Sequence, residues 1–489
     1  MQELSRADRA GRIIDSFEAT TRVDTVAVGA NVEPVADAHE RRRSVGLAAL
    51  LAVCCGYFMV ILDVTIVNVA APSIGRDLGA SLTDLQWIVD IYTVAFAGLL
   101  LLGGALGDRL GHRRVFCVGV AVFTIASLGC MVAGDVITLT AFRLVEGLGA
   151  ALLVPGSLAL LQQVYVTPAA RARAFGLWGA IAGVAATAGP LVGGVLTNTV
   201  GWRWVFAINL PVGVACLALT MATVGPSARD HARIIDWLGQ AAVGVTVAAL
   251  ITALNELGRQ GIRGPVVIAG LLVTAAAGAF LVLRERFGAN PPLPRAMLGS
   301  RPLTGGTVIG YLFNFGFYGM IFAASVYFQQ HEKFSAAYTG LALLPAVAVT
   351  MVASALSGRL AGRFAHRRLM IIGLLIACAG LTLWAVSGDS PSYPILVLAM
   401  VGCGFGTSFT LTGATSTVMA AASSGYAGTA SAVLNTARQT GSAAGVAISG
   451  SLIAALGLTT GVSTFMAVGA AGYLLGAGLA LIYVPSRSR

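Results

Sequence analysis

Residues 104–114 read GALGDRLGHRR, a short polar stretch between two apolar runs, and part of it recurs later in the chain. Residues 361–368 read AGRFAHRR and match residues 107–114 at four of eight positions. The matched pairs are Arg109 with Arg363, His112 with His366, Arg113 with Arg367 and Arg114 with Arg368. Because weak internal repeats of this kind occur in membrane folds built from two related halves, the repeat predicts two such halves here.

The composition is that of a membrane protein. Of the 489 residues, 57% are hydrophobic and 11% are charged, and the mean hydropathy is +0.83. Soluble domains carry about 25% charged residues, and a membrane helix needs about 20 predominantly apolar residues. We therefore predict an all-α polytopic protein with fourteen transmembrane helices, near residues 45–70, 84–106, 114–133, 137–163, 172–197, 203–223, 236–255, 264–283, 304–328, 337–358, 369–386, 392–415, 432–456 and 463–484.

The positive charges between these helices predict their orientation. If the N-terminus is cytoplasmic, the inner tails and loops hold 24 Lys and Arg residues and the outer loops hold 5. Cytoplasmic loops of membrane proteins are enriched in Lys and Arg. The alternation therefore supports an even number of helices with both termini in the cytoplasm, and it explains the formal charge of +10 without a nucleic-acid partner.

The position of the repeat predicts how the helices are grouped. Its first copy follows the second helix and its second copy follows the tenth, whereas a direct repeat of six helices would place the second copy after the eighth. Two additional helices must therefore separate the halves in a 6+2+6 arrangement. The expected parts are a mostly disordered cytoplasmic tail at 1–44, a six-helix bundle at 45–223, two linker helices at 236–283 and a second six-helix bundle at 304–484.

Several classes of function lack the residues that they require. Lys333, the only lysine, follows His-Glu rather than a glycine-rich phosphate loop, which excludes a Walker-type ATPase. All seven cysteines fall in apolar segments without a C-x-x-C pair, and the five histidines lie in the tail or loops without metal-ligand spacing. We therefore expect no metal, no cofactor and no enzymatic activity.

Residues 104–114 resemble the signature of loop 2–3 in the major facilitator superfamily, with His112 in place of one basic residue. The resemblance implies a gating motif made by Gly104, Asp108, Gly111 and Arg113. The residues themselves allow a tight turn at the glycines, and Asp108 can pair with an arginine or cap the N-terminus of a neighbouring helix. The alternative is a simple topology anchor.

Three further runs resemble the fourteen-helix drug:proton antiporter branch of that family. They are LDVTIVNVAAP at 62–72, RLVEGLGAA at 143–151 and AATAGPLVGG at 185–194. Glu146 stands where the family usually has glutamine, and Ala185 stands where a glycine is common. In the last run, Gly189, Pro190, Gly193 and Gly194 permit close helix contact and a bend. The resemblance implies that this bend favours antiport over leak; ordinary packing of small residues is the alternative.

Several ionisable residues fall within the predicted helices, Arg438 in the helix at 432–456 among them, and uncompensated charge is costly there. Asp63, Asp90 and Arg143 lie about 10 Å from the outer helix ends at the rise of an α-helix, and Glu146 follows Arg143 by three residues, close enough for the two to neutralise each other. The resemblance implies a role for Arg143 in proton relay. We expect one carboxyl, Asp63 or Asp90 ahead of Glu146, to bind a proton from outside while a cationic drug competes for its charged form. A purely structural ion network is the alternative.

The helix predicted at 304–328 is rich in aromatic residues, which suit a flat apolar substrate, although lipid-facing and core packing produce the same composition. We expect Asn314, Phe317, Tyr318, Asn435 and Gln439 to line the substrate cavity.

Taken with the resemblance, these residues predict a proton-coupled antiporter in the bacterial cytoplasmic membrane. It would export small amphiphilic drugs or antibiotics by alternating access and act as a monomer in the lipid bilayer, with protons as its second substrate. The alternatives are a proton-linked transporter of an endogenous metabolite or lipid, and a membrane protein that transports nothing.

Overall fold

The computed structural model describes residues 35–230, 234–287, 293, 297, 299–361, 363–423 and 425–486. Within this part of the chain fourteen helices are long and apolar enough to cross a membrane, which confirms the predicted number. Residues Gly46–Arg489 form one compact unit that contains all of them. Residues 1–34 of the predicted tail lie outside the described residues.

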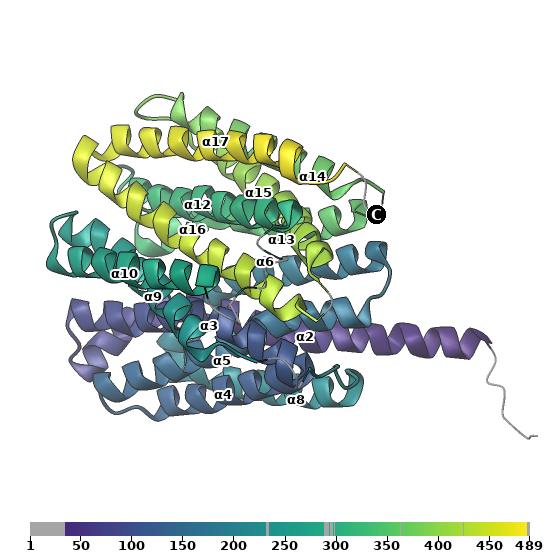
Figure 1. The fold of residues 1–489 in the computed structure, drawn as a ribbon. Coiled ribbons are helices and arrows are strands. Elements are labelled where there is room, and N and C mark those ends of the chain that lie inside the picture. The colour runs from purple at the N-terminus through teal and green to yellow at the C-terminus, as the bar shows by residue number, and fades with distance from the viewer. Residues whose placement is uncertain are drawn as a thin grey trace, which may run out of the picture. The chain divides into compact units, whose positions relative to one another are not determined.

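The first six spans form a bundle in which α5 packs against α3 and α4, and α4 packs against α8 (Figure 1). Its helices are α2 (Val35–Leu78), α3 (Leu82–Leu110), α4 (His112–Val132), α5 (Val136–Val164), α6 (Pro168–Thr199), the short α7 (Trp204–Ala207) and α8 (Asn209–Thr223). Helix α2 begins ten residues before the predicted start at 45. Polar caps set several starts, since the side chains of Ser81, Asp135 and Thr167 accept hydrogen bonds from the first turns of α3, α5 and α6.

The last six spans repeat these neighbour relations. They are α12 (Arg301–Gln330), α13 (Ala336–Leu360), α14 (His366–Ala385), α15 (Tyr393–Ala421), α16 (Ala427–Leu456) and α17 (Leu458–Tyr483). Helix α15 packs against α13 and α14 as α5 packs against α3 and α4. Each half buries its own apolar cores, so the fold consists of two related bundles joined by an interface.

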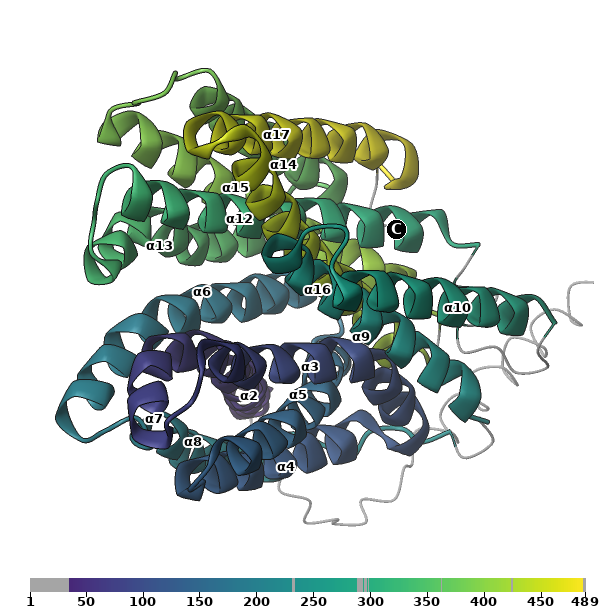
Figure 2. The same ribbon diagram turned by 90° about the vertical axis from the view of Figure 1, so that its left-hand side faces the viewer.

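Two further spans, α9 (Trp237–Gln260) and α10 (Pro265–Phe287), lie beside the bundles. Figure 2 shows α9 next to α3 and α16, with α10 packed on its outer side. Asp236 caps α9 and forms an ion pair with Arg284 of α10 over 2.5 Å. Burial opposes ionisation of Asp236, but hydrogen bonds from Arg284 and the Gly239 amide outweigh it and hold the pKa of Asp236 below its usual value.

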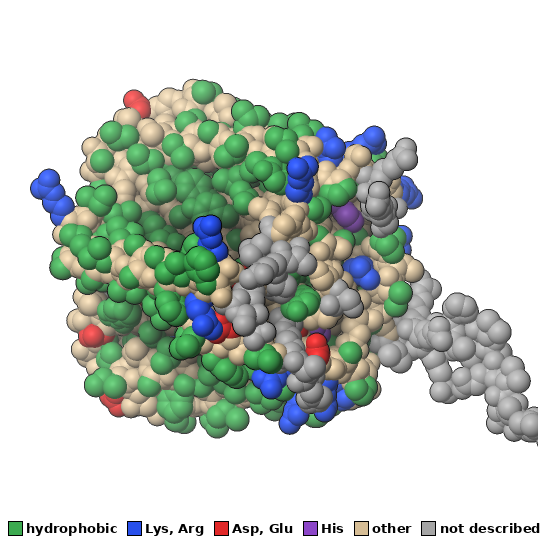
Figure 3. All heavy atoms as spheres, in the orientation of Figure 1, with side chains coloured by type: hydrophobic (Ala, Val, Ile, Leu, Met, Phe, Trp, Pro, Cys, Tyr) green, Lys and Arg blue, Asp and Glu red, His purple; other side chains and the backbone are tan. Residues whose placement is uncertain are grey.

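The bundles meet where α3 and α5 contact α16, and where α6 contacts α13 and α15. One end of the helices carries most of the basic residues, and we call it the basic end. It is the end where α17 finishes, and on the face in Figure 3 most Lys and Arg side chains lie over it, at the right. Its arginines include Arg109, Arg113, Arg114, Arg171, Arg173, Arg359, Arg363, Arg367 and Arg368.

Candidate functional site

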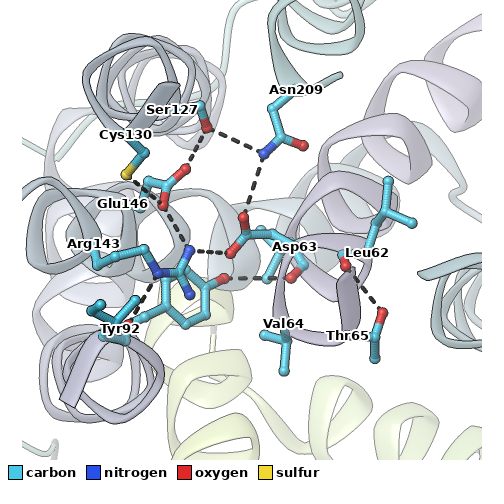
Figure 4. Close-up of polar contacts among 12 residues, drawn as sticks. Leu62, Asp63, Val64, Thr65, Tyr92, Ser127, Cys130, Arg143, Glu146 and Asn209 are labelled. Carbon is cyan, nitrogen blue, oxygen red and sulfur yellow. Dashed lines mark hydrogen bonds and ion pairs between the residues drawn. The ribbon is translucent and has the colours of Figure 1, made fainter. Parts of the chain in front are cut away.

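A buried ion cluster joins α2 and α5 inside the first bundle (Figure 4). Asp63 of α2 and Glu146 of α5 are 0% exposed, and Arg143 between them is 1% exposed. Arg143 Nη1 donates to Asp63 Oδ2 over 2.5 Å and to Glu146 Oε2 over 2.7 Å. The three-residue spacing on one helix brings Glu146 under Arg143, whereas the contact with Asp63 depends on the packing of α2 against α5.

Neutral side chains from α4 and α8 hold the two carboxylates in place (Figure 4). Ser127 Oγ donates a short hydrogen bond to Glu146 Oε1, and Cys130 Sγ lies 3.5 Å from Glu146 Oε2. Asn209 Nδ2 donates to Asp63 Oδ1 over 3.4 Å and to Ser127 Oγ over 3.2 Å. Four helices therefore contribute to one polar network inside an apolar bundle.

Aromatic rings and a backbone carbonyl fix the guanidinium from the other side. Arg143 Cζ lies 4.4 Å from the centre of the Tyr92 ring and 5.9 Å from that of Phe206. Arg143 Nε donates to the carbonyl of Ile88 over 3.2 Å. The cation is thus held by hydrogen bonds, ion pairs and cation–π contacts together, which limits the cost of burying it.

The charges of the cluster do not balance. Two carboxylates face one guanidinium, so the fully ionised cluster has a formal net charge of −1, and its three side chains are at most 1% exposed. Burying unpaired charge is costly. One proton on either carboxyl removes the net charge and leaves Arg143 with one ionised partner. The arrangement is therefore chemically suited to bind a single proton at a shared site.

Asp90 has the same predicted depth as Asp63 and Arg143, but it lies on another side of its helix. It is half-buried on α3, two residues after Ile88 and two before Tyr92, which both contact Arg143. Since successive residues of a helix are rotated by about 100°, Asp90 lies on the opposite side of α3 from these two. The structure brings together Asp63, Arg143 and Glu146, and it does not place Asp90 with them.

The neutral side chains of the network were not predicted from the sequence. Ser127, Cys130, Asn209 and Tyr92 look like ordinary residues of apolar helices. Asn209 is the one member that the sequence could have indicated, because a buried amide within an apolar run requires a hydrogen-bond partner. Its partners come from helices distant in the sequence, so their identity could not be predicted from spacing alone.

The loop motif joins the two bundles at the basic end. Asp108 at the end of α3 is 5% exposed and accepts hydrogen bonds from the first turn of α16. Its Oδ1 accepts from the Gly428 amide over 2.8 Å, and its Oδ2 accepts from the Thr429 amide over 2.9 Å and from Thr429 Oγ1 over 2.6 Å. A carboxylate at a helix N-terminus is favoured by the free amides and by the helix dipole.

The other three motif residues have separate structural roles at the same end of the bundle. A Cβ on Gly104 would lie 2.4 Å from the carbonyl oxygen of Gly428, so glycine lets α3 approach α16. Gly111 has φ +94°, the left-handed conformation that lets the chain turn from α3 into α4. Arg113 Nη2 donates to the carbonyl of Met221 over 2.8 Å, which ties α4 to the end of α8.

The glycine-rich run of α6 packs against α2 beside the ion cluster. A Cβ on Gly189 would lie 1.9 Å from Thr65 Oγ1, and one on Gly193 would lie 2.8 Å from Ile66 Cγ1. Gly194 faces open space, since a Cβ added there would have no atom within 4 Å, and Pro190 is exposed within the helix. Close contact with α2 therefore requires Gly189 and Gly193, whereas it does not require Gly194.

The five expected substrate residues lie on the neighbouring helices α12 and α16. The amides of Asn314 and Asn435 are buried and donate to carbonyls of their own helices, Gly310 over 3.0 Å and Ser431 over 2.9 Å. Tyr318 is 43% exposed in the middle of α12, and its ring meets that of Phe317 edge-on at 5.5 Å. Phe317 and Gln439 are half-buried.

Comparison with known proteins gives consistent matches over most of the chain. Residues 53–446 match the family model of the Major Facilitator Superfamily. The methylenomycin A resistance protein of Bacillus subtilis (strain 168) is 37% identical over 419 residues, 85% of this chain and 89% of that protein. The tetracenomycin C resistance and export protein of Streptomyces glaucescens is 36% identical over 83% of this chain and 75% of that protein. The proton:xylose symporter XylE, bound to 6-bromo-6-deoxy-D-glucose, shares the fold with a TM-score of 0.63 at 16% identity, over 91% of this chain and 97% of that one.

Proposed function

Because this chain belongs to the major facilitator superfamily, and is thus a multi-pass membrane transporter rather than an enzyme, we propose that it is a proton-coupled antiporter. It exports small amphiphilic drugs or antibiotics across the bacterial cytoplasmic membrane. The names of its relatives, which include antibiotic resistance and export proteins, support the substrate class. Relatives from Bacillus and Streptomyces support a bacterial membrane.

One observation carries the proton coupling: Asp63 and Glu146 share Arg143 in a site with almost no exposed surface. When a proton binds Asp63, Arg143 keeps only Glu146 of its own helix as an ionised partner, and the contact between α2 and α5 loses its ion pair. When the proton leaves, the second ion pair forms again. The protonation state therefore changes how strongly α2 is held, and a change of this kind couples proton binding to helix movement.

The contacts between the bundles support alternating access. At the basic end, Asp108 caps α16, and Gln162 of α5 donates to the carbonyl of Met419 on α15 over 3.2 Å. A Cβ on Gly176 of α6 would lie 2.6 Å from the Cα of Gly358 on α13, so these helices touch there too. We assign the basic end to the cytoplasm from its arginines. On this assignment the closed side is the cytoplasmic one, and the proposal includes cytoplasmic termini.

The proposed function is tested in inside-out membrane vesicles that contain the protein and carry a proton gradient. We expect compounds from a panel of amphiphilic drugs and antibiotics to accumulate and to dissipate the gradient, and an uncoupler to abolish both effects. Vesicles without the protein give the baseline. If no compound in the panel moves in a protein-dependent way, the assignment to drug:proton antiport is wrong.

The closure at the basic end yields a separate prediction for Asp108→Asn. The amide can accept at only one of the two positions that face the start of α16, and it lacks the charge that favours the helix N-terminus. Loss of a cap costs about 0.5–2 kcal/mol, so we expect the amides of Gly428 and Thr429 to exchange about 2- to 30-fold faster. Hydrogen-exchange mass spectrometry of the first turn of α16 measures this change.

The matched control is Asp135→Asn, because Asp135 caps α5 at the opposite end and accepts from the Thr138 amide over 2.8 Å. This variant should accelerate exchange at the start of α5 and leave the start of α16 unchanged. Equal exchange at Gly428 and Thr429 in wild type and Asp108→Asn would show that Asp108 does not hold the bundles together.

A further inference from the structure

Arg438 is a charged residue in the middle of the second bundle. It lies 11 residues after the start of α16 and 18 residues before its end, about 17 Å along the helix axis, which corresponds to the centre of a membrane. Its side chain is half-buried. A cation at this depth requires a counter-charge or polar partners to offset the cost of its desolvation.

The second half of the chain contains no carboxylate that could supply this counter-charge. Residues 301–489 include two acidic residues, Glu332 and Asp389, and both follow helix ends on the side opposite the basic end. Among the described residues no carboxylate is within ion-pair distance of Arg438. The contrast with Arg143 is clear, since that arginine, which also lies within a membrane span, has two carboxylates.

The polar contacts of Arg438 leave donors unused. Nη1 donates to Asn435 Oδ1 over 3.0 Å, and the buried Nε has no hydrogen-bond partner among the described residues. An unpaired buried donor costs free energy that a bound acceptor would recover. A guanidinium with Nε and terminal N–H groups available has the fork geometry that binds a carboxylate through two parallel hydrogen bonds.

Aromatic residues from both bundles surround this guanidinium. Arg438 Cζ lies 6.0 Å from the centre of the Trp178 ring on α6 and 5.9 Å from that of the Phe313 ring on α12. Trp178 is itself stacked on Tyr57 of α2, with ring centres 3.8 Å apart.

We propose that Arg438 is the anion-binding residue of the substrate site, and that it binds transported compounds through a carboxylate or a similar acidic group. The proposal rests on the proposed export function and names a substrate class for it. The acidic group pairs with Nη and Nε of Arg438. Trp178 and Phe313 are 0% and 1% exposed in this closed state, so an attached flat apolar body packs against them only after the bundles separate. The first bundle then binds the proton, and the second bundle provides most of the contacts to the anionic substrate.

The test is equilibrium binding to the purified full-length protein, with 1-naphthoate as the anionic probe and 1-naphthamide as its neutral counterpart of similar shape. Quenching of tryptophan fluorescence reports binding, because Trp178 lies beside Arg438. We expect wild type to bind 1-naphthoate at least about tenfold more tightly than 1-naphthamide, the effect of a charge-assisted hydrogen bond. Arg438→Gln should abolish this preference and lower the affinity for 1-naphthamide much less than that for 1-naphthoate.

Two further variants serve as controls for loss of folding and for non-specific effects of charge. Arg438→Lys keeps the charge but lacks the fork, so its preference should be reduced and still detectable. Arg203→Gln removes an arginine that is exposed and paired with Asp77 at the far end, and it should keep the full preference. The neutral probe shows that each variant retains its binding site.

The proposal is overturned if wild type shows no preference for the anionic probe, or if either Arg438 variant keeps the full wild-type preference. Because binding is measured without a proton gradient, a failure of proton-driven transport in vesicles leaves this result unaffected. Conversely, an antiporter that prefers neutral or cationic compounds would retain the proposed function and lose only the anion site.

Discussion

Asp63→Asn should reduce export against a concentration gradient to the level of membranes without the protein. The substitution keeps the size and one hydrogen-bond acceptor of the side chain, and Arg143 keeps its ion pair with Glu146. The variant should therefore fold and insert. It cannot, however, alternate between one and two ionised partners for Arg143, so the proton no longer changes the contact between α2 and α5. Accumulation in energised inside-out vesicles measures the effect.

Asp77→Asn is the matched control, because Asp77 lies on the same helix but is exposed and paired with Arg203 at the outer end. Exposed ion pairs contribute about 0–1 kcal/mol, so this variant should export as wild type does. Downhill efflux of preloaded substrate should persist in Asp63→Asn, which separates loss of coupling from loss of the protein. Wild-type uphill export by Asp63→Asn at equal expression would make the ion cluster purely structural.

Gly189→Ala should destabilise the protein and impair export, whereas Gly194→Ala should do neither. The added Cβ at Gly189 would lie 1.9 Å from Thr65 Oγ1 and 2.6 Å from Thr65 Cβ, so a change of side-chain rotamer cannot relieve the clash. Helix α6 must then move away from α2 at Thr65, which lies two residues after Asp63. Overpacking of this kind costs about 1–3 kcal/mol.

The two glycines make an internal comparison, because both belong to the same motif and Gly194 has open space around it. Thermal unfolding followed by size-exclusion chromatography reports stability, and vesicle transport reports function. Equal unfolding temperatures for the two variants would contradict the packing role assigned to Gly189. A loss of export confined to Gly194→Ala would point to a role of that position in substrate passage.

The number of membrane helices was predictable from sequence because each span requires a long apolar run, and all fourteen runs occur as helices. Within one helix, the spacing of Arg143 and Glu146 indicated their contact. Contacts between helices were harder to predict, because residues at similar depth can face different directions. Asp90 illustrates this limit, since its depth suggested the cluster but its rotation on α3 takes it elsewhere.

The role of Asp108 shows a similar limit. The motif allowed either a pair with an arginine or a cap on a neighbouring helix, and the structure has the cap. The choice depends on Gly428 and Thr429, more than 300 residues away, which no local pattern links to Asp108. Likewise, the sequence located Arg438 within a helix, but only the packing placed it beside Trp178 and Phe313, with no carboxylate of the described residues within ion-pair distance.

The most direct test of the proposed coupling is proton movement driven by substrate alone. Proteoliposomes loaded with an exported compound, without an initial pH gradient, should take up protons as the compound leaves through wild-type protein. Asp63→Asn should release the compound with no proton uptake above that of empty liposomes. Equal proton uptake by wild type and Asp63→Asn would contradict the assignment of the Asp63–Arg143–Glu146 cluster as the coupling site.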